Sequence, residues 1–391
     1  MRLRIIQSMN NAIQSFNLSE IPSLLEGLGQ PRFRAKQLTS WLYQRGAHSY
    51  DEMTNLPKAL REVLTAEYPL IEPKVVNKQV SHDGTRKYVF EYADGAKVEA
   101  VGIPSFEKKE TKDEPKHLTV CFSTQAGCAM GCTFCATGHE GLTRNLSSAE
   151  MVCQIIAVRQ DFGCRVTNLV SMGQGEPFQN YQATMEALRF ANGKDGLEIG
   201  ARHITVSTCG ILQGIEKLSN EPEQFTLAVS LHSALQDVRN EIMPRCSNIA
   251  LPQLKKALRT YVKKTGRRVS FEYLLIKGVT DTEENLAALI DFCDGLLCHV
   301  NLLSVNEVDG SPYKQPSNAT AMGERTEERR KRSDHPQFSR QRYRWSLRPA
   351  QEQNVANALP GLINQKAPQP NSRGAFVIPG YRNLLLLSCC Y

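Results

Sequence analysis

The chain has 391 residues, 41% of them hydrophobic, which is enough for a large catalytic domain with one or two small modules. No run of about 18 apolar residues occurs and Met1–Phe16 has no signal-peptide core, so we expect a cytoplasmic protein without a membrane partner. The twelve cysteines form no regular paired framework, which favours metal or redox chemistry in a reducing compartment.

The net charge of +7 would ordinarily suggest a nucleic-acid partner, but it is unevenly distributed. Residues 324–391 hold 12 Lys and Arg against 5 Asp and Glu, which accounts for the whole excess. The preceding 323 residues are neutral, with 35 charges of each sign. The excess positive charge therefore lies entirely in residues 324–391.

After an N-terminal extension (1–17), residues 18–70 predict a small helical module. Leu24, Leu25 and Leu28 follow one helical face, and Gln30-Pro31 ends that helix. A second helix begins at Phe33, and a third contains Leu60 and Leu64. The module's polar faces are either a solvated surface or an RNA-docking surface. The basic residues on these faces are Arg34, Lys36, Arg45, Lys58 and Arg61.

In residues 71–117, apolar and polar residues first alternate with a period of two, and a charged loop follows. Two Asp-Gly turns, at Asp83-Gly84 and Asp94-Gly95, predict a β-hairpin region. The strands expected around these turns are Gln79–Ser81, Lys87–Tyr92 and Lys97–Val101. Glu99 lies in the last of them, where the pattern alone indicates a solvent-facing residue.

Residues 118–316 alternate between short apolar strands and helices, which predicts an α/β fold with a partial (βα)6 barrel. The expected strands are Leu118–Ser123, Val166–Met172, His203–Thr208, Phe225–Leu231, Val269–Ile276 and Val300–Ser304. The expected helices are Ser148–Asp161, Thr184–Asn192, Leu251–Lys264 and Glu283–Cys293. Functional residues of such sheets gather beyond the carboxyl ends of the strands.

Three cysteines follow the first expected strand with the spacing C-x3-C-x2-C: Cys128, Cys132 and Cys135. Three thiolates can hold three corners of a [4Fe-4S] cluster and leave the fourth iron open, or they can form a zinc knuckle that lacks one ligand. The spacing, with Phe134 before the last cysteine, resembles the signature of the radical S-adenosylmethionine (SAM) enzymes. That resemblance implies a cluster that cleaves SAM to a 5′-deoxyadenosyl radical.

Polar motifs follow several other strands. Gly173-Gln174-Gly175-Glu176-Pro177 comes after the second, where glycines allow close backbone approach and a Glu can accept from an ammonium group. Ser207-Thr208-Cys209-Gly210 and Ser230-Leu231-His232 follow the next two, and the last strand runs into Asn306. Taken singly, each motif is equally compatible with a tight turn or ordinary strand-end capping.

The ordered combination of motifs over residues 18–316 resembles the RlmN dual-specificity RNA methyltransferases. The matching motifs are Phe33-Arg34-Ala35-Lys36-Gln37, Asp51-Glu52-Met53-Thr54, Cys121-x6-Cys128, Gly138-x2-Gly141-x2-Arg144-Asn145-Leu146, Met172-Gly173-x-Gly175-Glu176-Pro177, Ser207-Thr208-x-Gly210, Ser230-Leu231-His232 and His299-Val300-Asn301-Leu302.

This resemblance implies a 23S rRNA and tRNA (adenine-C2)-methyltransferase with a radical SAM barrel. Cys128, Cys132 and Cys135 would bind the cluster, Glu99 would accept a proton, and Cys121 would resolve an enzyme–RNA crosslink. The SAM site would consist of Phe134, Gly175, Glu176, Ser207, Ser230, Leu231, His232 and Asn306. The expected partners are 23S rRNA, tRNA and an electron donor such as flavodoxin or ferredoxin, and we expect a monomer. The cysteines without a matching role, interpreted as core or surface thiols, are Cys153, Cys164, Cys209, Cys246, Cys293 and Cys298.

The resemblance stops near Pro316. The family continues with a helix, a strand and an R-G-x-D-I-x-A-A-C-G-Q-L segment that bears a methyl-carrier cysteine, and this sequence has none of these. Residues 317–391 are instead basic and aperiodic, with cysteines only at Cys389 and Cys390. A shifted reading frame after about residue 322, a genuine RNA-binding tail, or a tail that returns a terminal cysteine to the site would each explain this.

Three rival functions share some of these features. The related class that methylates C8 of the rRNA adenosine has the same cysteines and cluster, although the helical module fits the C2 enzymes better. A non-catalytic RNA-binding protein could hold zinc at the three cysteines. A radical SAM activase of glycyl-radical enzymes would have no reason to keep Cys121 and the helical module.

Overall fold

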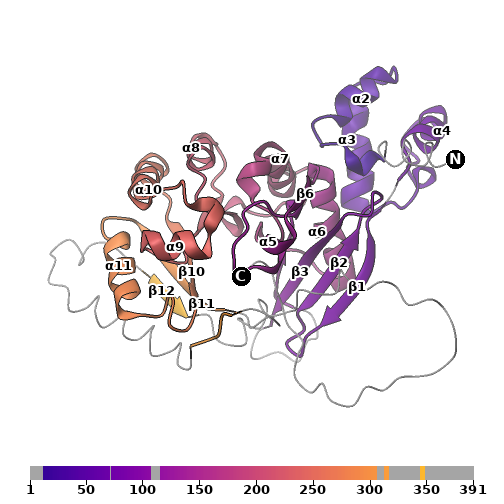
Figure 1. Cartoon of the computed structure of the whole chain (residues 1–391). Coiled ribbons are helices and arrows are strands. Elements are labelled where there is room, and N and C mark those ends of the chain that lie inside the picture. The colour runs from indigo at the N-terminus through magenta and orange to yellow at the C-terminus, as the bar shows by residue number, and fades with distance from the viewer. Residues whose placement is uncertain (1–11, 71, 107–114, 306–311, 317–343, 348–391) are drawn as a thin grey trace, which may run out of the picture.

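This computed structural model describes residues 12–70, 72–106, 115–305, 312–316 and the backbone of 344–347. Within these residues a ten-stranded sheet has the order β1-β2-β3-β4-β7-β8-β9-β10-β11-β12, and β5 pairs with β6 in a second sheet (Figure 1). The strands are β1 (Lys74–Val80), β2 (Arg86–Glu91), β3 (Lys97–Ser105), β4 (His117–Cys121), β5 (Gln125–Gly127), β6 (Leu142–Asn145), β7 (Asn168–Val170), β8 (Ile204–Thr208), β9 (Thr226–Ser230), β10 (Val269–Leu275), β11 (Cys298–Ser304) and β12 (Arg344–Leu347).

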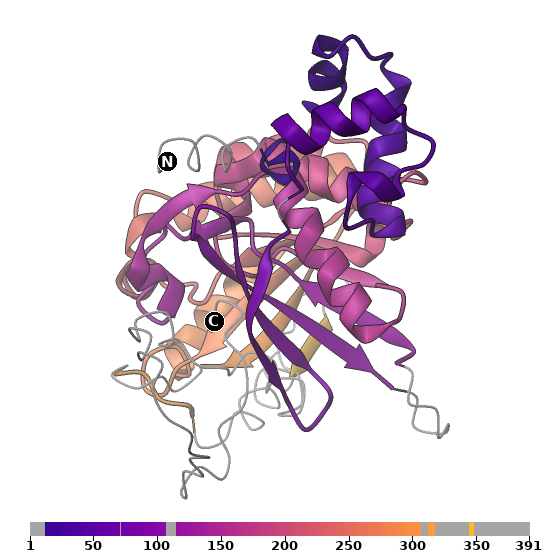
Figure 2. The ribbon, with the colours of Figure 1, turned by 90° about the vertical axis from the view of Figure 1, so that its right-hand side faces the viewer.

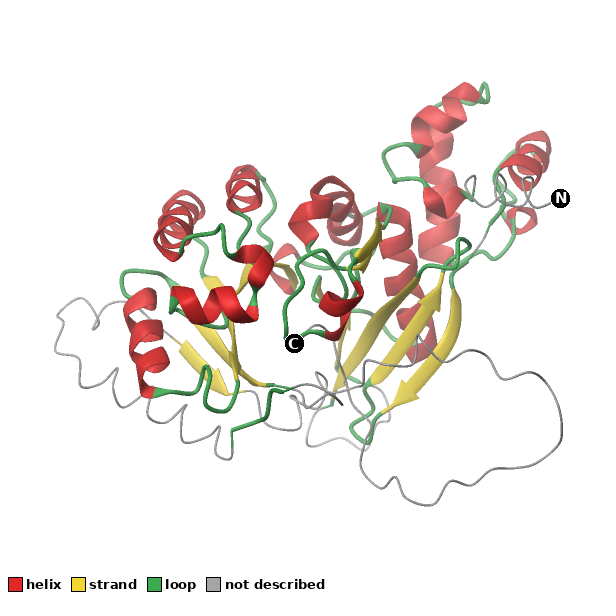
Figure 3. Cartoon of the chain, viewed as in Figure 1, coloured by secondary structure: helices red, strands yellow, loops and turns green. Residues whose placement is uncertain are grey.

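The neighbours from β4 to β12 are all parallel, which confirms the predicted barrel-like α/β core. Its strands are apolar and nearly buried, as expected for a sheet covered by helices. Figure 3 shows the crossover helices along the outer side of the sheet. The helices of this core are α5 (Ala136–Glu140), α6 (Ser148–Phe162), α7 (Tyr181–Asn192), α8 (Leu212–Asn220), α9 (Gln236–Ile242), α10 (Leu251–Thr265) and α11 (Glu283–Cys293).

Two details of the core differ from the sequence-based expectation. Strand β7 covers only Asn168–Val170; Ser171 still donates to the Thr205 carbonyl of β8 at 3.1 Å before the chain turns into the glycine-rich loop. Strand β12 lies in the tail that we had interpreted as aperiodic, and it pairs in parallel with β11. The rest of residues 317–391 lies outside the described residues.

The predicted β-hairpin region is an antiparallel extension of the same sheet. Both Asp-Gly turns occur where expected, with positive φ at Gly84 and Gly95, and β1 starts earlier than predicted, at Lys74. Strand β3 then pairs with the first core strand, β4. Side chains on β2 and β3 can therefore share a face with side chains of the barrel.

The helical module contains α2 (Ile21–Gly27), α3 (Phe33–Thr39), the π-helical turn η2 (Ser40–Arg45) and α4 (Lys58–Glu67). Figure 2 shows it at one end of the molecule. It packs on α6 and α7, where the Tyr43 ring meets Phe190 edge-on at 5.5 Å and Ser19 donates a 2.9 Å hydrogen bond to Glu186.

Some of the module's basic side chains already have partners. Lys36 lies 2.8 Å from Asp195, and the Arg45 guanidinium lies 4.2 Å from the Trp41 ring centroid. Arg34 donates to a backbone carbonyl at 2.9 Å. An RNA-docking role for this surface stays a prediction. No helix among the described residues has the length and apolar character needed to cross a membrane.

Candidate active site

A short hairpin holds the cysteine loop. Strands β5 and β6 pair antiparallel, and the loop begins at Gly127, which has φ +75°. A Cβ at Gly127 would lie 2.0 Å from the carbonyl oxygen of Gly141. The Cys128 amide donates to that same carbonyl at 2.8 Å. Only glycine fits this close approach, which sets where the first cysteine leaves the hairpin.

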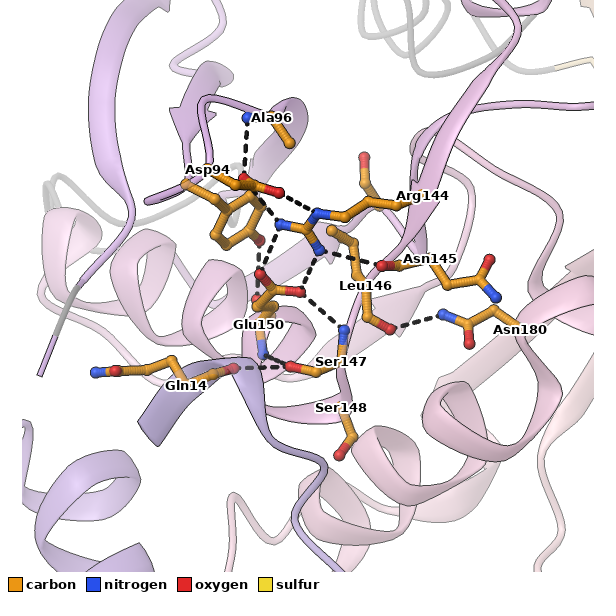
Figure 4. Close-up of polar contacts among 12 residues, drawn as sticks. Gln14, Asp94, Ala96, Arg144, Asn145, Leu146, Ser147, Ser148, Glu150 and Asn180 are labelled. Carbon is orange, nitrogen blue, oxygen red and sulfur yellow. Dashed lines mark hydrogen bonds and ion pairs between the residues drawn. The ribbon is translucent and has the colours of Figure 1, made fainter. Parts of the chain in front are cut away.

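Arg144, on the returning strand β6, fixes the hairpin to the body of the protein (Figure 4). Its guanidinium makes two 2.9 Å hydrogen bonds to Glu150, at the start of α6, and bonds of 2.5 and 3.1 Å to Asp94, in the β2–β3 turn. Glu150 also accepts from the Ser147 amide at 2.8 Å, completing the predicted capping box. One arginine thus joins the cysteine hairpin, a core helix and the β-hairpin region.

The three cysteines line one open pocket at the carboxyl ends of the parallel strands. The empty space between its lining residues, open solvent included, is about 510 Å³. The residues that line it are Cys128, Met130, Cys132, Phe134, Cys135, Met172, Gly173, Gly175, Glu176, Pro177, Ser207, Thr208, Cys209, Ser230, His232 and Met243. The structure therefore brings together most of the residues that the sequence analysis proposed for the cluster and SAM sites.

The donor set fits an iron–sulfur cluster. Burial raises the pKa of the Cys128 thiol to about 12 and that of Cys132 well above its ordinary value, and the neighbouring thiols add to both shifts. Closely spaced thiolates need a cationic centre to be stable. No three Cys, His, Asp or Glu side chains in the described part of the chain lie close enough to hold one metal ion. Three cysteines in one pocket match a cluster that needs three protein ligands, whereas a closed zinc site would need four.

The glycine-rich loop after β7 forms a second wall of the pocket. A Cβ at Gly173 would lie 2.6 Å from the backbone of Phe122, so the loop can lie against the end of β4 only with glycine there. The Glu176 carboxylate accepts from the amides of Phe178 at 3.0 Å and Cys209 at 2.7 Å. Burial raises the Glu176 pKa, although these hydrogen bonds oppose the rise. Glu176 faces the pocket and also joins two strand-end loops.

Four further predicted residues line this pocket: Phe134, Ser207, Ser230 and His232. The Phe134 ring meets the His232 ring edge-on at 4.9 Å, which joins the cysteine loop to the end of β9. Ser207 lines the pocket and donates a 2.5 Å hydrogen bond to the Ser171 carbonyl. Leu231, by contrast, is fully buried in the hydrophobic core, and Asn306 lies outside the described residues.

Glu99 and Cys121 lie on one face of the sheet. Val101 on β3 is directly opposite Cys121 on β4, and Cys121 is level with Val170 on β7. Glu99 is two residues from Val101, so its side chain is on that same face. Met172 packs against Cys121 and Val101 and also lines the cysteine pocket. The face that carries both predicted catalytic residues therefore leads to the pocket.

The environment of Glu99 explains why the strand pattern misjudged it. Its carboxylate lies 2.7 Å from the Lys87 ammonium, and the two side chains are only 12% and 5% exposed. Burial raises the Glu99 pKa, Lys87 lowers it, and nearby Glu140 raises it again. A solvent-facing strand residue is thus the wrong interpretation, because Lys87 pairs with Glu99 on a largely buried face and Glu140 of α5 lies near enough to affect the Glu99 pKa.

Sequence reasoning also missed two residues of the site. Cys209, interpreted as a core or surface thiol, lines the pocket. Arg239 on α9 is fully buried and donates to the Cys209 carbonyl at 2.5 Å. The signal for Arg239 was its position between Leu235 and Ile242, which places a charge in an apolar helical stripe.

Comparison with known proteins agrees with this geometry. Residues 122–290 match the radical SAM superfamily, and residues 12–69 match the ribosomal RNA large subunit methyltransferase N-terminal domain. A protein from Clostridium novyi named "Probable dual-specificity RNA methyltransferase RlmN" is 40% identical over 305 residues, covering 78% of this chain and 86% of that protein. The chain belongs to the RlmN family. A relative of the same name from Geobacillus kaustophilus is 43% identical over 308 residues, covering 77% of this chain and 81% of the relative.

A solved structure agrees as well. The crystal structure of a radical SAM methyltransferase from Sphaerobacter thermophilus superposes with a TM-score of 0.74 at 41% identity, covering 86% of this chain and 94% of that one. The predicted family, fold class and enzyme class are therefore confirmed. Because radical SAM enzymes use a [4Fe-4S] cluster and SAM, family membership also confirms the predicted cofactors.

Proposed function

We propose that this site is built to methylate C2 of adenosine in 23S rRNA and tRNA by a radical route, and that this chain carries out the radical step but lacks a recognisable methyl-carrier cysteine to complete the transfer. The observation that carries the proposal is the shared sheet face, on which Glu99 and Cys121 lie beside the cysteine pocket. A base and a nucleophile on the face of a cluster pocket suit a reaction that ends in proton removal and sulfur exchange.

The chemistry of the substrate explains why a radical is needed. Adenine C2 is an electron-poor carbon and cannot attack the methyl group of SAM as a nucleophile, whereas a carbon radical can add to it. When bound, the cluster and SAM supply that radical chemistry. Cys128, Cys132 and Cys135 would hold the cluster, leaving one iron for the methionine end of SAM. Phe134, Gly175, Glu176, Ser207, Ser230, Leu231, His232 and Asn306 would form the SAM site.

Glu99 and Cys121 would act after the methylene carbon has joined the base. Glu99 would accept the C2 proton, and its buried position limits competition from water. The Cys121 sulfur would attack the carrier sulfur, forming a disulfide and breaking the bond between that sulfur and carbon. The former methylene carbon keeps that electron pair and takes up one proton, such as the one lost by the Cys121 thiol, which leaves a methyl group on C2. The one unpaired electron left by the radical addition would pass to a one-electron acceptor, a role that the oxidised cluster would supply when bound.

The methyl-carrier cysteine is the component that the described residues do not supply. After Pro316 the sequence offers only Cys389 and Cys390, neither of which lies in the described part of the chain. The radical step and the complete methyl transfer can be tested separately on the full chain reconstituted anaerobically with iron and sulfide. Release of 5′-deoxyadenosine from SAM reports the radical step, and 2-methyladenosine in 23S rRNA or tRNA reports the complete reaction.

The expected result is about four irons with sulfide per chain and 5′-deoxyadenosine that disappears in C128A. Stoichiometric zinc without iron would reject the proposal in favour of a zinc-containing RNA-binding protein. Formation of 8-methyladenosine would assign the chain to C8 chemistry. The RlmN names of the relatives and the matched N-terminal domain favour C2. Flavodoxin or ferredoxin as electron donor, a monomeric state and a cytoplasmic location stay predictions.

A further inference from the structure

Arg239 is a buried cation that faces thiols rather than carboxylates in the described part of the chain: the pKa of the buried Cys246 thiol is lowered by a hydrogen bond with Cys209 and then by the Arg239 charge. Its side chain is fully buried, and two of its three guanidinium nitrogens, Nε and Nη1, have no hydrogen-bond partner. The third, Nη2, donates to a neutral carbonyl, that of Cys209. No ion pair within the described residues includes Arg239. A guanidinium kept from water without compensation costs several kcal/mol, so a partner is expected.

The position of Arg239 indicates what that partner is. Its helix packs on the cysteine loop, because the Ile242 carbonyl, one turn further along α9, accepts from the Thr133 amide at 3.0 Å. The guanidinium donates at 2.5 Å to the carbonyl of Cys209, which lines the pocket, and its Nη2 lies 3.6 Å from the position that a Cβ would take at Gly210. The charge therefore lies directly behind the wall of the pocket.

We propose that Arg239 is a positioning residue for the iron–sulfur cluster, supplying the buried positive charge that stabilises the cluster anion and its reduced form. A cluster held by three thiolates is an anion, and reduction adds another negative charge. In a buried site a fixed cation favours the more negative state and so raises the reduction potential. The inference rests on the proposed ligation by Cys128, Cys132 and Cys135.

The test compares R239M, which removes the charge but keeps an apolar side chain of similar length, with R239K, which keeps the charge. The matched control is R245M: Arg245 also lies beside the cysteine loop, 3.5 Å from the Cβ that Gly131 lacks, but it is exposed. The measurement is the cluster midpoint potential of the reconstituted full chain, from a redox titration followed by electron paramagnetic resonance.

We expect R239M to disfavour reduction at least tenfold, a shift of about 59 mV to lower potential for a one-electron couple. R239K and R245M should stay close to the wild-type potential, the latter because solvent screens an exposed charge. If R239M retains no cluster, R239K should still load iron at the wild-type potential. An R239M cluster with unchanged potential, or loss of the cluster from both variants, would overturn the inference.

A second measurement needs no cofactor. Without iron, R239M should melt no lower than the wild-type protein, because the unpaired buried charge is gone; a marked loss would show a structural role for Arg239 instead. Failure of the wild-type chain to take up iron would contradict the proposed function. A normal wild-type cluster whose midpoint potential is unchanged in R239M would contradict only this inference.

Discussion

The Lys87 ammonium lies 2.7 Å from the Glu99 carboxylate on the sheet face that also carries Cys121. The register places Lys87 opposite Val101, so the pair reaches diagonally from β2 to β3. Both side chains are almost excluded from water. Burial raises the Glu99 pKa, and the Lys87 ammonium opposes that rise.

Removing Lys87 should make stability depend on pH. In K87M the Glu99 pKa should rise further above its ordinary value, because burial would act without the opposing cation. A carboxyl group whose pKa is higher in the folded state stabilises the fold at low pH and loses that contribution as pH rises through the folded-state pKa. We expect K87M to unfold about 3–5 kcal/mol more easily than wild type at pH 8, and the deficit to shrink at pH 5. Denaturant unfolding of the iron-free chain at both pH values measures this.

The double variant K87M/E99Q is the control for this pair. With both charges absent, most of the lost stability and the added pH dependence should return, since removing a buried pair is far less costly than orphaning one member. A K87M deficit that is the same at pH 5 and pH 8 would contradict the assignment and would indicate lost packing.

The Arg144 network should control retention of the cluster. R144M removes charge-assisted hydrogen bonds to Glu150 and Asp94, and we expect a loss of about 2 kcal/mol or more in unfolding free energy. The β5–β6 hairpin should exchange its amide hydrogens faster, and the reconstituted variant should hold less iron. The matched control is R189M, which breaks a comparable network with Glu221 and Glu223 away from the cysteines. Equal iron loss in both variants would show that general destabilisation is the cause.

The sequence predicted the barrel well, because its signals are local and strong. Helix α11 has the predicted bounds, and the capping box at Ser147 and Glu150 starts α6 as expected. The cysteine pocket was also predictable, since parallel strands place their carboxyl ends at one edge of the sheet. These features depend on periodicity and strand order, both of which a single sequence displays.

The remaining features depend on contacts between segments far apart in sequence. Nothing around Glu99 shows that its face of β3 is covered, because the cover comes from Lys87 and from α5, more than thirty residues later. The buried state of Arg239 depends likewise on the Cys209 loop. Strand β12 could not be found from its surroundings, since its pairing with β11 is its only regular feature among the described residues.

The two glycines of the cysteine hairpin should respond differently to alanine. Both have φ +75°, but a Cβ at Gly127 would lie 2.0 Å from the Gly141 carbonyl, whereas a Cβ at Gly141 meets nothing within 4 Å. G141A should cost about 1–3 kcal/mol from backbone strain alone, because with ψ at −173° this residue lies in a region that essentially only glycine adopts. G127A should cost more and should displace Cys128, which donates to that carbonyl. Thermal unfolding and iron content measure the two effects, and equal losses in both variants would remove the role assigned to the close approach.

The tail should decide whether the radical step leads to methyl transfer. Replacing residues 317–391 with a C-terminal segment that contains the family's R-G-x-D-I-x-A-A-C-G-Q-L motif should yield 2-methyladenosine in 23S rRNA, because the family resemblance implies that the cysteine of this motif carries the methyl group. The unmodified chain should release 5′-deoxyadenosine from SAM at a similar rate but form no 2-methyladenosine, since its only cysteines after Pro316 are the terminal pair. Mass spectrometry of digested RNA reads out the difference. If the unmodified chain does methylate RNA, C389S and C390S identify the terminal thiol that acts as carrier, and the prediction of an uncoupled radical step is wrong.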